Sequence, residues 1–419
     1  MSRYLQIAEK FNYLLFILAV CMLPYPTRIS LYAWVAWLIS WLFEGRFLHK
    51  KNVKWHKGLI PILILAALFL WECISYSWAI SQIDAVHMII RHISFVGIIP
   101  IAVWGVNVRY DWNKILKFFI CSSILSIIVY GVYLYIFQYW EYISEYHQLP
   151  NFIRRWSYYG DQISYTKHRL YYGTILNLAI VALLNVDSLQ LPMHRRNKGL
   201  MIIFFICLFL LVLGIILTQS RANLLTLLLL CAVAIIQSLH GRIRIVGFAL
   251  VVVLGITFGN ILFTQHPRFE EIRLEHVMKR EIFQIDEIEP RINIWYGALQ
   301  TPQDYFWSGV GAGGNSEYLK PIFASFNWDS FRDQAYNAHN QYLGVLINLG
   351  IFAAILFLLN WVLYPLWYKG RLRKVATLVA LVLGSNMLTE NMLDRIDGVI
   401  ITCVTLVTIS LLSRAQLAK

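Results

Sequence analysis

Long apolar runs separated by short polar segments make up most of the chain. A helix needs about 20 predominantly apolar residues to cross a bilayer, and twelve runs come close to or exceed that length. They cover residues 11–27, 29–45, 58–78, 86–106, 115–138, 170–186, 199–218, 223–240, 245–264, 339–366, 375–391 and 397–413. The pattern predicts an all-α integral membrane protein with about twelve transmembrane helices.

The polar segments between these runs predict the orientation. Lys and Arg recur in every second loop, as at residues 46–57 and 369–374. Basic loops tend to remain in the cytoplasm, so both termini are predicted to be cytoplasmic. One long segment on the opposite side, residues 265–338, divides the chain. Nine helices over 1–264 precede this large loop, and three helices over 339–419 follow it.

The large loop 265–338 is expected to be partly helical. Apolar residues recur between Ile272 and Phe283 with the spacing of an amphipathic helix. A second helix is predicted from Pro290, because proline suits the first turn. The glycine-rich run 309–314 lacks the Gly-Lys-Ser/Thr ending of a nucleotide-binding Walker A loop. We expect it to form a tight turn that lets other backbone approach closely.

Composition and charge agree with a membrane protein. Hydrophobic residues make up 58% of the chain and charged residues 14%, against about 45–50% and 25% in soluble domains. The net charge of +13 would suggest nucleic acid as a partner of a soluble protein. Here the basic residues lie in short loops between apolar runs, so anionic membrane lipids are the expected partner and nucleic acid is not.

Two arginines are candidates for binding an anion at the outer face. Arg221 lies between the runs 199–218 and 223–240, where an arginine is costly unless it pairs or binds an anion. Arg291 lies near a predicted helix start, where free backbone N–H groups add to the guanidinium. The alternatives are an arginine that snorkels to the interface at 221 and an ion pair within the loop at 291.

His339 is the candidate proton acceptor. It stands where the large loop enters the tenth apolar run. A histidine that titrates near neutral pH can take a proton from a sugar hydroxyl. The alternative is an interfacial histidine with a backbone partner. Gly350 follows about three helical turns later, so it is predicted on the same helix face, where a neighbouring helix could approach closely.

Further polar residues are predicted at the same membrane face. His168 and Arg169 open the sixth run, and Glu390 ends the eleventh. Arg91 lies about two turns below the outer end of the fourth run, and Glu72, near the outer end of the third run, is expected to form a structural pair with it. No metal-ligand spacing and no nucleophile elbow occur. A cavity with several arginines, a histidine and a carboxylate suits a diphosphate leaving group and a hydroxyl nucleophile.

Several of these segments resemble the O-antigen ligase family of Gram-negative bacteria. The family pattern is His, then Asn, Ser or Gln, nine residues, Gly, two residues, and Gly, Thr or Tyr. Here His339-Asn340 is followed at that spacing by Gly350. The last position departs from the pattern, since it is Ala353. The segment around Arg221 is similar to the family's arginine between adjacent spans.

Two other positions extend the resemblance. Arg291 is similar to the family's arginine in the large periplasmic loop, and Glu390 stands where related ligases carry an acidic residue. The resemblance covers the second half of the chain well and the first half mainly by topology.

The resemblance implies a GT-C-like glycosyltransferase of the bacterial inner membrane with its active site at the periplasmic face. Such an enzyme transfers O-antigen polysaccharide from undecaprenyl diphosphate to the lipid A–core oligosaccharide, with inversion, and needs no metal or other cofactor. It implies that His339 is the general base and that Arg221 and Arg291 bind the donor diphosphate. Supporting roles fall to Glu390, Asn340, His168 and Arg169.

Three alternatives remain open. An O-antigen polymerase of the same superfamily would use another lipid-linked glycan as acceptor. A protein O-oligosaccharyltransferase would transfer the glycan to periplasmic proteins. A polysaccharide transporter would need charged residues along a path at mid-membrane, whereas the candidate residues gather mostly at one face.

Overall fold

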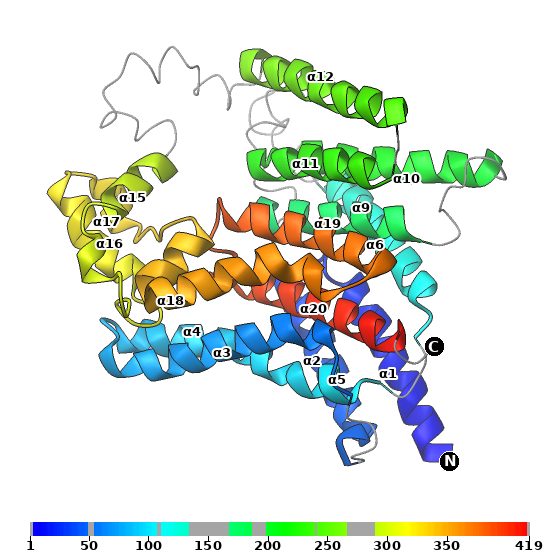
Figure 1. The fold of residues 1–419 in the computed structure, drawn as a ribbon, viewed down its shortest axis with the longest axis horizontal. Coiled ribbons are helices and arrows are strands. Elements are labelled where there is room, and N and C mark those ends of the chain that lie inside the picture. Colours follow the sequence, from blue (N-terminus) through cyan, green and yellow to red (C-terminus); the bar gives the residue numbers. More distant parts are fainter. Residues whose placement is uncertain are drawn as a thin grey trace.

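The computed structural model describes residues 3–48, 54–106, 110–133, 167–186, 198–238, 241–265 and 290–416. Within these ranges the chain forms helices and connecting turns, with no strand. A helix stands at each of the twelve apolar runs, and Figure 1 shows how these helices are arranged. They are α1 (Arg3–Cys21), α2 (Thr27–Phe43), α3 (Ile60–Ser75), α4 (Gln82–Gly97) with its continuation α5 (Ile99–Trp104), α6 (Trp112–Tyr133), α9 (Arg169–Asn185), α10 (Lys198–Leu217), α11 (Arg221–Ser238), α12 (Gly241–Gln265), α18 (Gln341–Leu363), α19 (Gly370–Met387) and α20 (Ile396–Gln416).

The lengths of these helices support a membrane protein. In the described part of the chain, seven helical stretches are long and apolar enough to cross a bilayer, and α4 with α5 forms one of them. Two shorter apolar helices lie at Arg169–Asn185 and Ile243–Thr257. The all-helical class is therefore confirmed. A membrane crossing by all twelve helices stays a prediction.

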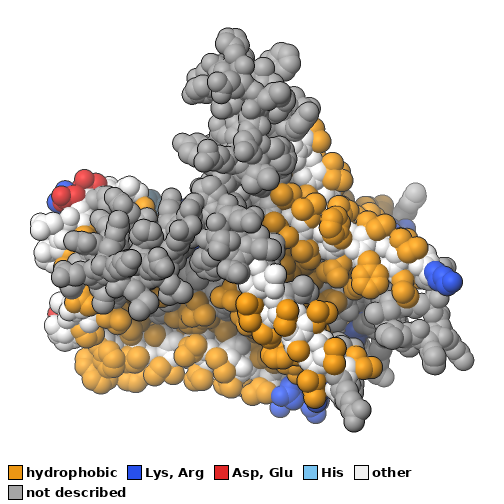
Figure 2. Space-filling view, turned by 90° about the horizontal axis from the view of Figure 1, so that it is seen from above, with side chains coloured by type: hydrophobic (Ala, Val, Ile, Leu, Met, Phe, Trp, Pro, Cys, Tyr) orange, Lys and Arg blue, Asp and Glu red, His pale blue; other side chains and the backbone are white. Residues whose placement is uncertain are grey.

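The bundle has a buried centre and a lipid-like flank. Nearly every side chain of α9 between Leu170 and Leu183 is buried, because α6, α10, α11 and α19 all pack around it. On α10, by contrast, buried positions are few and large aliphatic and aromatic side chains are exposed. Figure 2 shows hydrophobic side chains covering most of the visible flank of the described helices. Such an exposed apolar surface suits contact with lipid.

Among the described residues between α12 and α18, three short α-helices form a separate small core. They are α15 (Pro290–Ala298), α16 (Asn315–Ser325) and α17 (Asp329–Asp333). Ile294, Phe323 and Phe331 are buried together there with Ile347 of α18. The helix expected from Pro290 is confirmed as α15. The amphipathic helix expected between Ile272 and Phe283 lies outside the described residues. In Figure 1 the two termini lie at the end of the bundle away from these helices.

The glycine-rich run 309–314 fastens this small core to the bundle. Gly309 has a φ of +72° and lies against the backbone of Asn348. The N–H of Val310 donates to the carbonyl of Ile347 at 2.8 Å, and the N–H of Gly311 donates to that of Asn348 at 3.0 Å. The expected tight turn with close backbone approach is confirmed.

The expectation for Gly350 is wrong. It was expected to share a helix face with His339 and to let a neighbouring helix approach. Instead α18 begins only at Gln341, and Gly350 interrupts it with a φ of +82°. The segment that packs there is a loop, because the N–H of Ile351 donates to the carbonyl of Phe306 at 2.7 Å. An unbroken helix would leave no free N–H for this contact.

We predict that Gly350→Ala destabilises the protein. The strained left-handed backbone alone costs a residue with a Cβ about 1–3 kcal/mol, and the added Cβ would also overlap the carbonyl group of Trp307. Thermal unfolding of the purified protein in detergent measures the change. Gly131→Ala is the control, because it lies within α6 with open space around the added Cβ. It should leave stability unchanged or raise it. Equal unfolding temperatures for Gly350→Ala and wild type would contradict the prediction.

Candidate functional site

His339 lies just before the first turn of α18 and faces a carboxylate. Its Nδ1 is 3.2 Å from the carboxylate of Glu390. The backbone takes a left-handed φ of +43°, and its N–H donates to Oδ1 of Asn337 at 3.0 Å. Such strain in a non-glycine residue is typical of functional sites. About a fifth of the histidine side chain is exposed, at 22%, so it is accessible from outside the bundle.

Glu390 belongs to the short connection between α19 and α20. Burial by itself would raise the pKa of its carboxyl. The hydrogen bond and charge of His339 lower it, and the charges of His168 and Arg291 lower it further. The net effect is a pKa below its ordinary value, so the group is ionised at neutral pH. Three residues expected at one face thus act on a single carboxylate.

Arg291, on the first turn of α15, reaches the same connection. Its Nε donates to the carbonyl of Thr389 at 2.9 Å, next to Glu390 in the chain. One turn further along α15, the indole N–H of Trp295 donates to the carbonyl of Ala338 at 2.8 Å. The helix of the large loop therefore contacts both chain segments that carry the His339–Glu390 pair.

Asn340 caps the start of α18. Its Oδ1 accepts from the N–H groups of Tyr342 and Leu343 at 3.0 and 3.1 Å, which caps α18. Its own N–H donates to Oδ1 of Asn391 at 2.7 Å. Asn340 thus joins the start of α18 to the connection that carries Glu390.

His168 and Arg169 lie at the start of α9. His168 is the residue before the helix, and its Nδ1 accepts from the N–H of Leu170 at 3.4 Å. The preceding Lys167 is buried and forms an ion pair of 2.6 Å with Asp397 of α20. This pair holds the segment that carries His168 close to Glu390. Arg169 occupies the first helical position, at the same end of the bundle.

Arg221 begins α11, directly beside α9. Asn223, two residues on, donates from Nδ2 to the carbonyl of Leu170 at 2.9 Å. One turn later, the hydroxyl groups of Thr226 and Ser385 of α19 lie 2.7 Å apart. The start of α11 is therefore held against the start of α9 and near the end of α19, which precedes Glu390.

Residues 206–358, from within α10 to within α18, match the family model described as O-antigen ligase. This part of the chain is similar to the O-antigen ligase family. The matched range contains Arg221, Arg291 and His339, while His168 and Glu390 lie outside it. No curated protein matches the sequence.

The site also includes asparagines that the sequence did not single out, and they gather around Asp394, which follows Glu390 at the end of the eleventh run. Asp394 accepts at Oδ2 from the side-chain amides of Asn391 and Asn337, at 2.9 and 3.1 Å. Burial raises the pKa of the Asp394 carboxyl. Asparagines cluster on both segments, at 337 and 340 and at 386 and 391. That clustering was the available signal, because asparagine is rare in membrane-spanning helices and common in backbone caps.

The expected pair of Glu72 with Arg91 is wrong. Glu72 pairs with the next residue, His92, at 2.8 Å. Arg91 donates from Nη1 to the carbonyl of Asp394 at 2.6 Å. Consecutive residues point about 100° apart around a helix, so only one of the two faces α3. His92 was missed, although it lies in the same apolar run.

In the part of the chain that the structure describes, no group of three or more His, Cys, Asp or Glu side chains is arranged to hold a metal ion. The groups that are gathered are a histidine paired with a carboxylate, and arginines beside it. Together they can accept a proton and offset the negative charge of a phosphate ester.

We predict a pH-dependent loss of stability in Glu390→Gln. Because the folded pKa of Glu390 lies below its ordinary 4.5, its charge stabilises the fold above that pH. The contribution disappears as the pH falls through the lowered pKa. Unfolding temperatures should therefore differ most near neutral pH and converge in acid. Glu317→Gln, on α16, controls for removal of a negative charge elsewhere. A difference in unfolding temperature between Glu390→Gln and wild type that grows in acid would contradict a lowered pKa of Glu390.

Proposed function

We propose that this protein is an O-antigen ligase, a GT-C-like glycosyltransferase. It transfers O-antigen polysaccharide from undecaprenyl diphosphate to the lipid A–core oligosaccharide. The observation that carries this proposal is the contact of 3.2 Å between His339 Nδ1 and Glu390. A histidine oriented by a carboxylate is a recurrent way to hold a general base.

The pair suits removal of a proton from an acceptor hydroxyl. When Nδ1 of neutral His339 donates to Glu390, Nε2 is the basic nitrogen. The acceptor oxygen forms a bond to the anomeric carbon of the donor sugar, and its proton passes to Nε2. The bond from that carbon to the diphosphate breaks, and undecaprenyl diphosphate leaves with the electron pair. Attack from the opposite face inverts the anomeric carbon. Glu390 acts through His339 as a positioning residue.

The arginines supply the counter-charge that the leaving group needs. A diphosphate gains negative charge as the sugar departs, and guanidinium groups stabilise that charge through directed hydrogen bonds. Arg291 adjoins the His339–Glu390 pair through its contact with Thr389, and Arg221 begins α11 at the same end of the bundle. His168 and Arg169 are further donor or acceptor contacts. No metal and no other cofactor enters this scheme.

The proposed location is the bacterial inner membrane, with both termini in the cytoplasm and the site at the periplasmic face. Two features support it. The basic loops alternate along the sequence. In Figure 1 the termini lie at the end of the bundle opposite the helices of the large loop. A site at the level of the lipid headgroups matches a donor and an acceptor that are both anchored in the membrane.

We expect His339→Ala to abolish ligation. The measurement is gel analysis of lipopolysaccharide from a ligase-deficient host that makes a compatible O-antigen. Wild type should restore the O-antigen ladder, and His339→Ala should not, because the acceptor proton then lacks its base. His87→Ala, at an exposed position of α4, is the control and should restore it. A ladder with His339→Ala at equal expression would disprove the general-base role.

A missing ladder with expressed wild type would contradict ligase activity. The same protein in a polymerase-deficient host would then test the polymerase alternative. Glycan on periplasmic proteins would instead indicate the protein O-oligosaccharyltransferase. Transfer by purified protein in detergent, where no membrane has to be crossed, would exclude a transporter.

Arg221→Lys and Arg291→Lys test the diphosphate contacts. Lysine retains the charge but loses the two-pronged hydrogen bonding of the guanidinium, so transfer from the lipid-linked donor should fall about tenfold or more. The rate is measured with purified protein, donor and lipid A–core. Arg332→Lys is the matched control, since Arg332 is a half-exposed arginine in the large loop that pairs with Asp329. An unchanged rate for both test variants would rule out the diphosphate role.

A further inference from the structure

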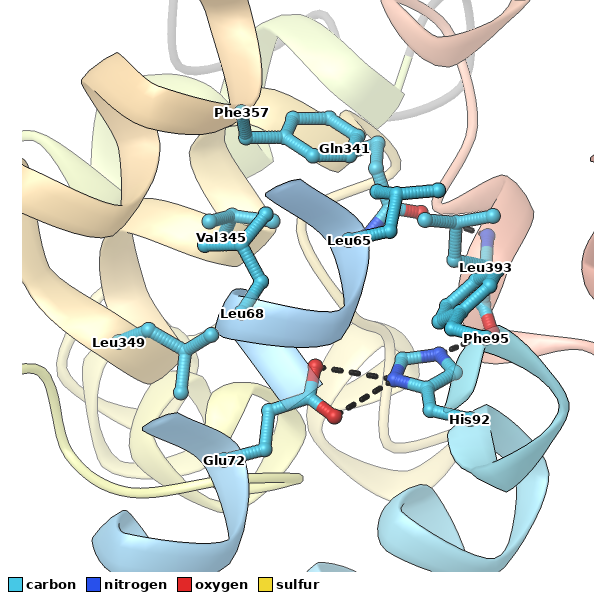
Figure 3. Close-up of a pocket in the computed structure, with 10 residues that line it drawn as sticks. All are labelled: Leu65, Leu68, Glu72, His92, Phe95, Gln341, Val345, Leu349, Phe357 and Leu393. Atoms are coloured by element: carbon cyan, nitrogen blue, oxygen red, sulfur yellow. Dashed lines mark hydrogen bonds and ion pairs between the residues drawn. The ribbon is translucent and has the colours of Figure 1, made fainter. Parts of the chain in front are cut away.

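A buried histidine–carboxylate pair connects α3 and α4 well inside the bundle, as Figure 3 shows. Nδ1 of His92 lies 2.8 and 2.9 Å from the two carboxylate oxygens of Glu72. Only 5% of Glu72 and 1% of His92 are exposed. Both residues belong to helices that are long and apolar enough to cross a membrane. Ionisable residues in such places are costly and usually have a task.

The other side of the His92 ring supports a third segment. Nε2 of His92 donates to the carbonyl of Leu393 at 2.9 Å. A carbonyl can only accept, so Nε2 carries a proton whichever partner holds the proton between Nδ1 and Glu72. The N–H of Leu393 donates to Oε1 of Gln341 on α18 at 2.6 Å. Both backbone polar groups of Leu393 are therefore satisfied by side chains of other helices.

The surroundings of this contact are apolar. The pocket in Figure 3 is lined by Leu65, Leu68, Phe95, Val345, Leu349 and Phe357 in addition to the polar residues. A hydrophobic pair of similar volume would pack α3 against α4 at least as favourably as a buried ion pair. Packing of the two helices therefore does not account for the pair. The hydrogen bond from His92 to the carbonyl of Leu393 accounts for it.

Leu393 lies on the connection that carries Glu390. The neighbouring Arg91 donates to the carbonyl of Asp394 at 2.6 Å. Successive residues of α4 thus hold successive carbonyls of the connection. Arg291 holds its beginning through Thr389. Glu390 lies between these attachments, with its carboxylate 3.2 Å from His339.

We propose that Glu72 and His92 are a positioning pair for glycan transfer. By holding Leu393, they set the place of Glu390 and hence the orientation of His339. The inference rests on the proposed transferase function, and neither residue touches the substrate. Because the pair acts on the position of Glu390, its removal should change the rate of the chemical step rather than substrate binding.

The test compares His92→Phe with His92→Gln in purified protein. Phenylalanine keeps a ring but has no donor, so kcat should fall about 10- to 100-fold, since an ångström of misplacement can cost that much. The KM for donor and acceptor should stay within about twofold, because binding groups are unaffected. Glutamine can donate to Leu393 and should restore kcat to within about threefold of wild type. An equal kcat for His92→Phe and wild type would overturn the proposal.

A buried polar residue elsewhere controls for general loss of packing. Asn12 of α1 donates to the hydroxyl of Ser40 on α2 at 2.9 Å and is fully buried. Asn12→Ala should lower stability and leave kcat per folded molecule unchanged. A similar fall in kcat for Asn12→Ala and His92→Phe would assign the effect to stability and overturn the proposal.

A double-mutant cycle tests the route through Glu390. If His92 acts by placing Glu390, His92→Phe should change kcat less than about twofold in a Glu390→Gln background. A purely structural role predicts that the two effects multiply. Multiplying effects would therefore overturn the proposal.

Hydrogen exchange separates this inference from the proposed function. In His92→Phe, the backbone amides of residues 388–395 should exchange about tenfold faster than in wild type, because their support is lost. Those of residues 400–410 in α20 should not change. Suppose that exchange is faster in His92→Phe but that wild type transfers no glycan. The hydrogen bond from His92 to Leu393 would then still support the connection, and the proposed function would be contradicted. Normal transfer by wild type with unchanged exchange in His92→Phe would contradict the positioning pair alone.

Discussion

The connection between α19 and α20 has to satisfy its backbone polar groups without a regular helix. It is largely buried, with Asn391, Met392 and Leu393 almost inaccessible. An unsatisfied buried N–H or carbonyl costs about 1–3 kcal/mol. Side chains from several helices supply the missing partners, including Arg91 and His92 of α4. The position of Glu390 therefore depends on helices that are distant in sequence.

This constraint explains why the site is built from helix ends. Backbone groups at a helix start have no partner within the helix, and four such starts converge on the connection. α9 brings His168, α11 brings Arg221, α15 brings Arg291, and α18 is preceded by His339. Each start brings the positive end of a helix dipole to the same side, which favours negative charge there. The bundle end is thus suited to an anionic group before any single side chain is considered.

Hydropathy predicted the helices because the length of an apolar run reflects the bilayer thickness, and all twelve runs form helices. The gathering of His339, Arg291 and Glu390 was also predictable, since topology alone assigns loop ends to one side. Which side chains pair with one another was not predictable. Pairing Glu72 with Arg91 instead of His92 was an error of one residue, which changes the helix face completely. The break at Gly350 was equally hidden, because its cause is a loop that docks from elsewhere.

The attachment of the small loop core to α18 restricts how a bulky substrate can reach the site. The core shares Ile347 with α18, and residues 306–311 are hydrogen-bonded to the interrupted turn around Gly350. A cover that is joined at one edge can swing open, but one that is also joined along α18 moves only if that helix moves. The described part of the loop is thus fixed to α18 along its length. If the proposed function holds, a lipid-linked donor would pass beside this fixed core instead of beneath a rising flap.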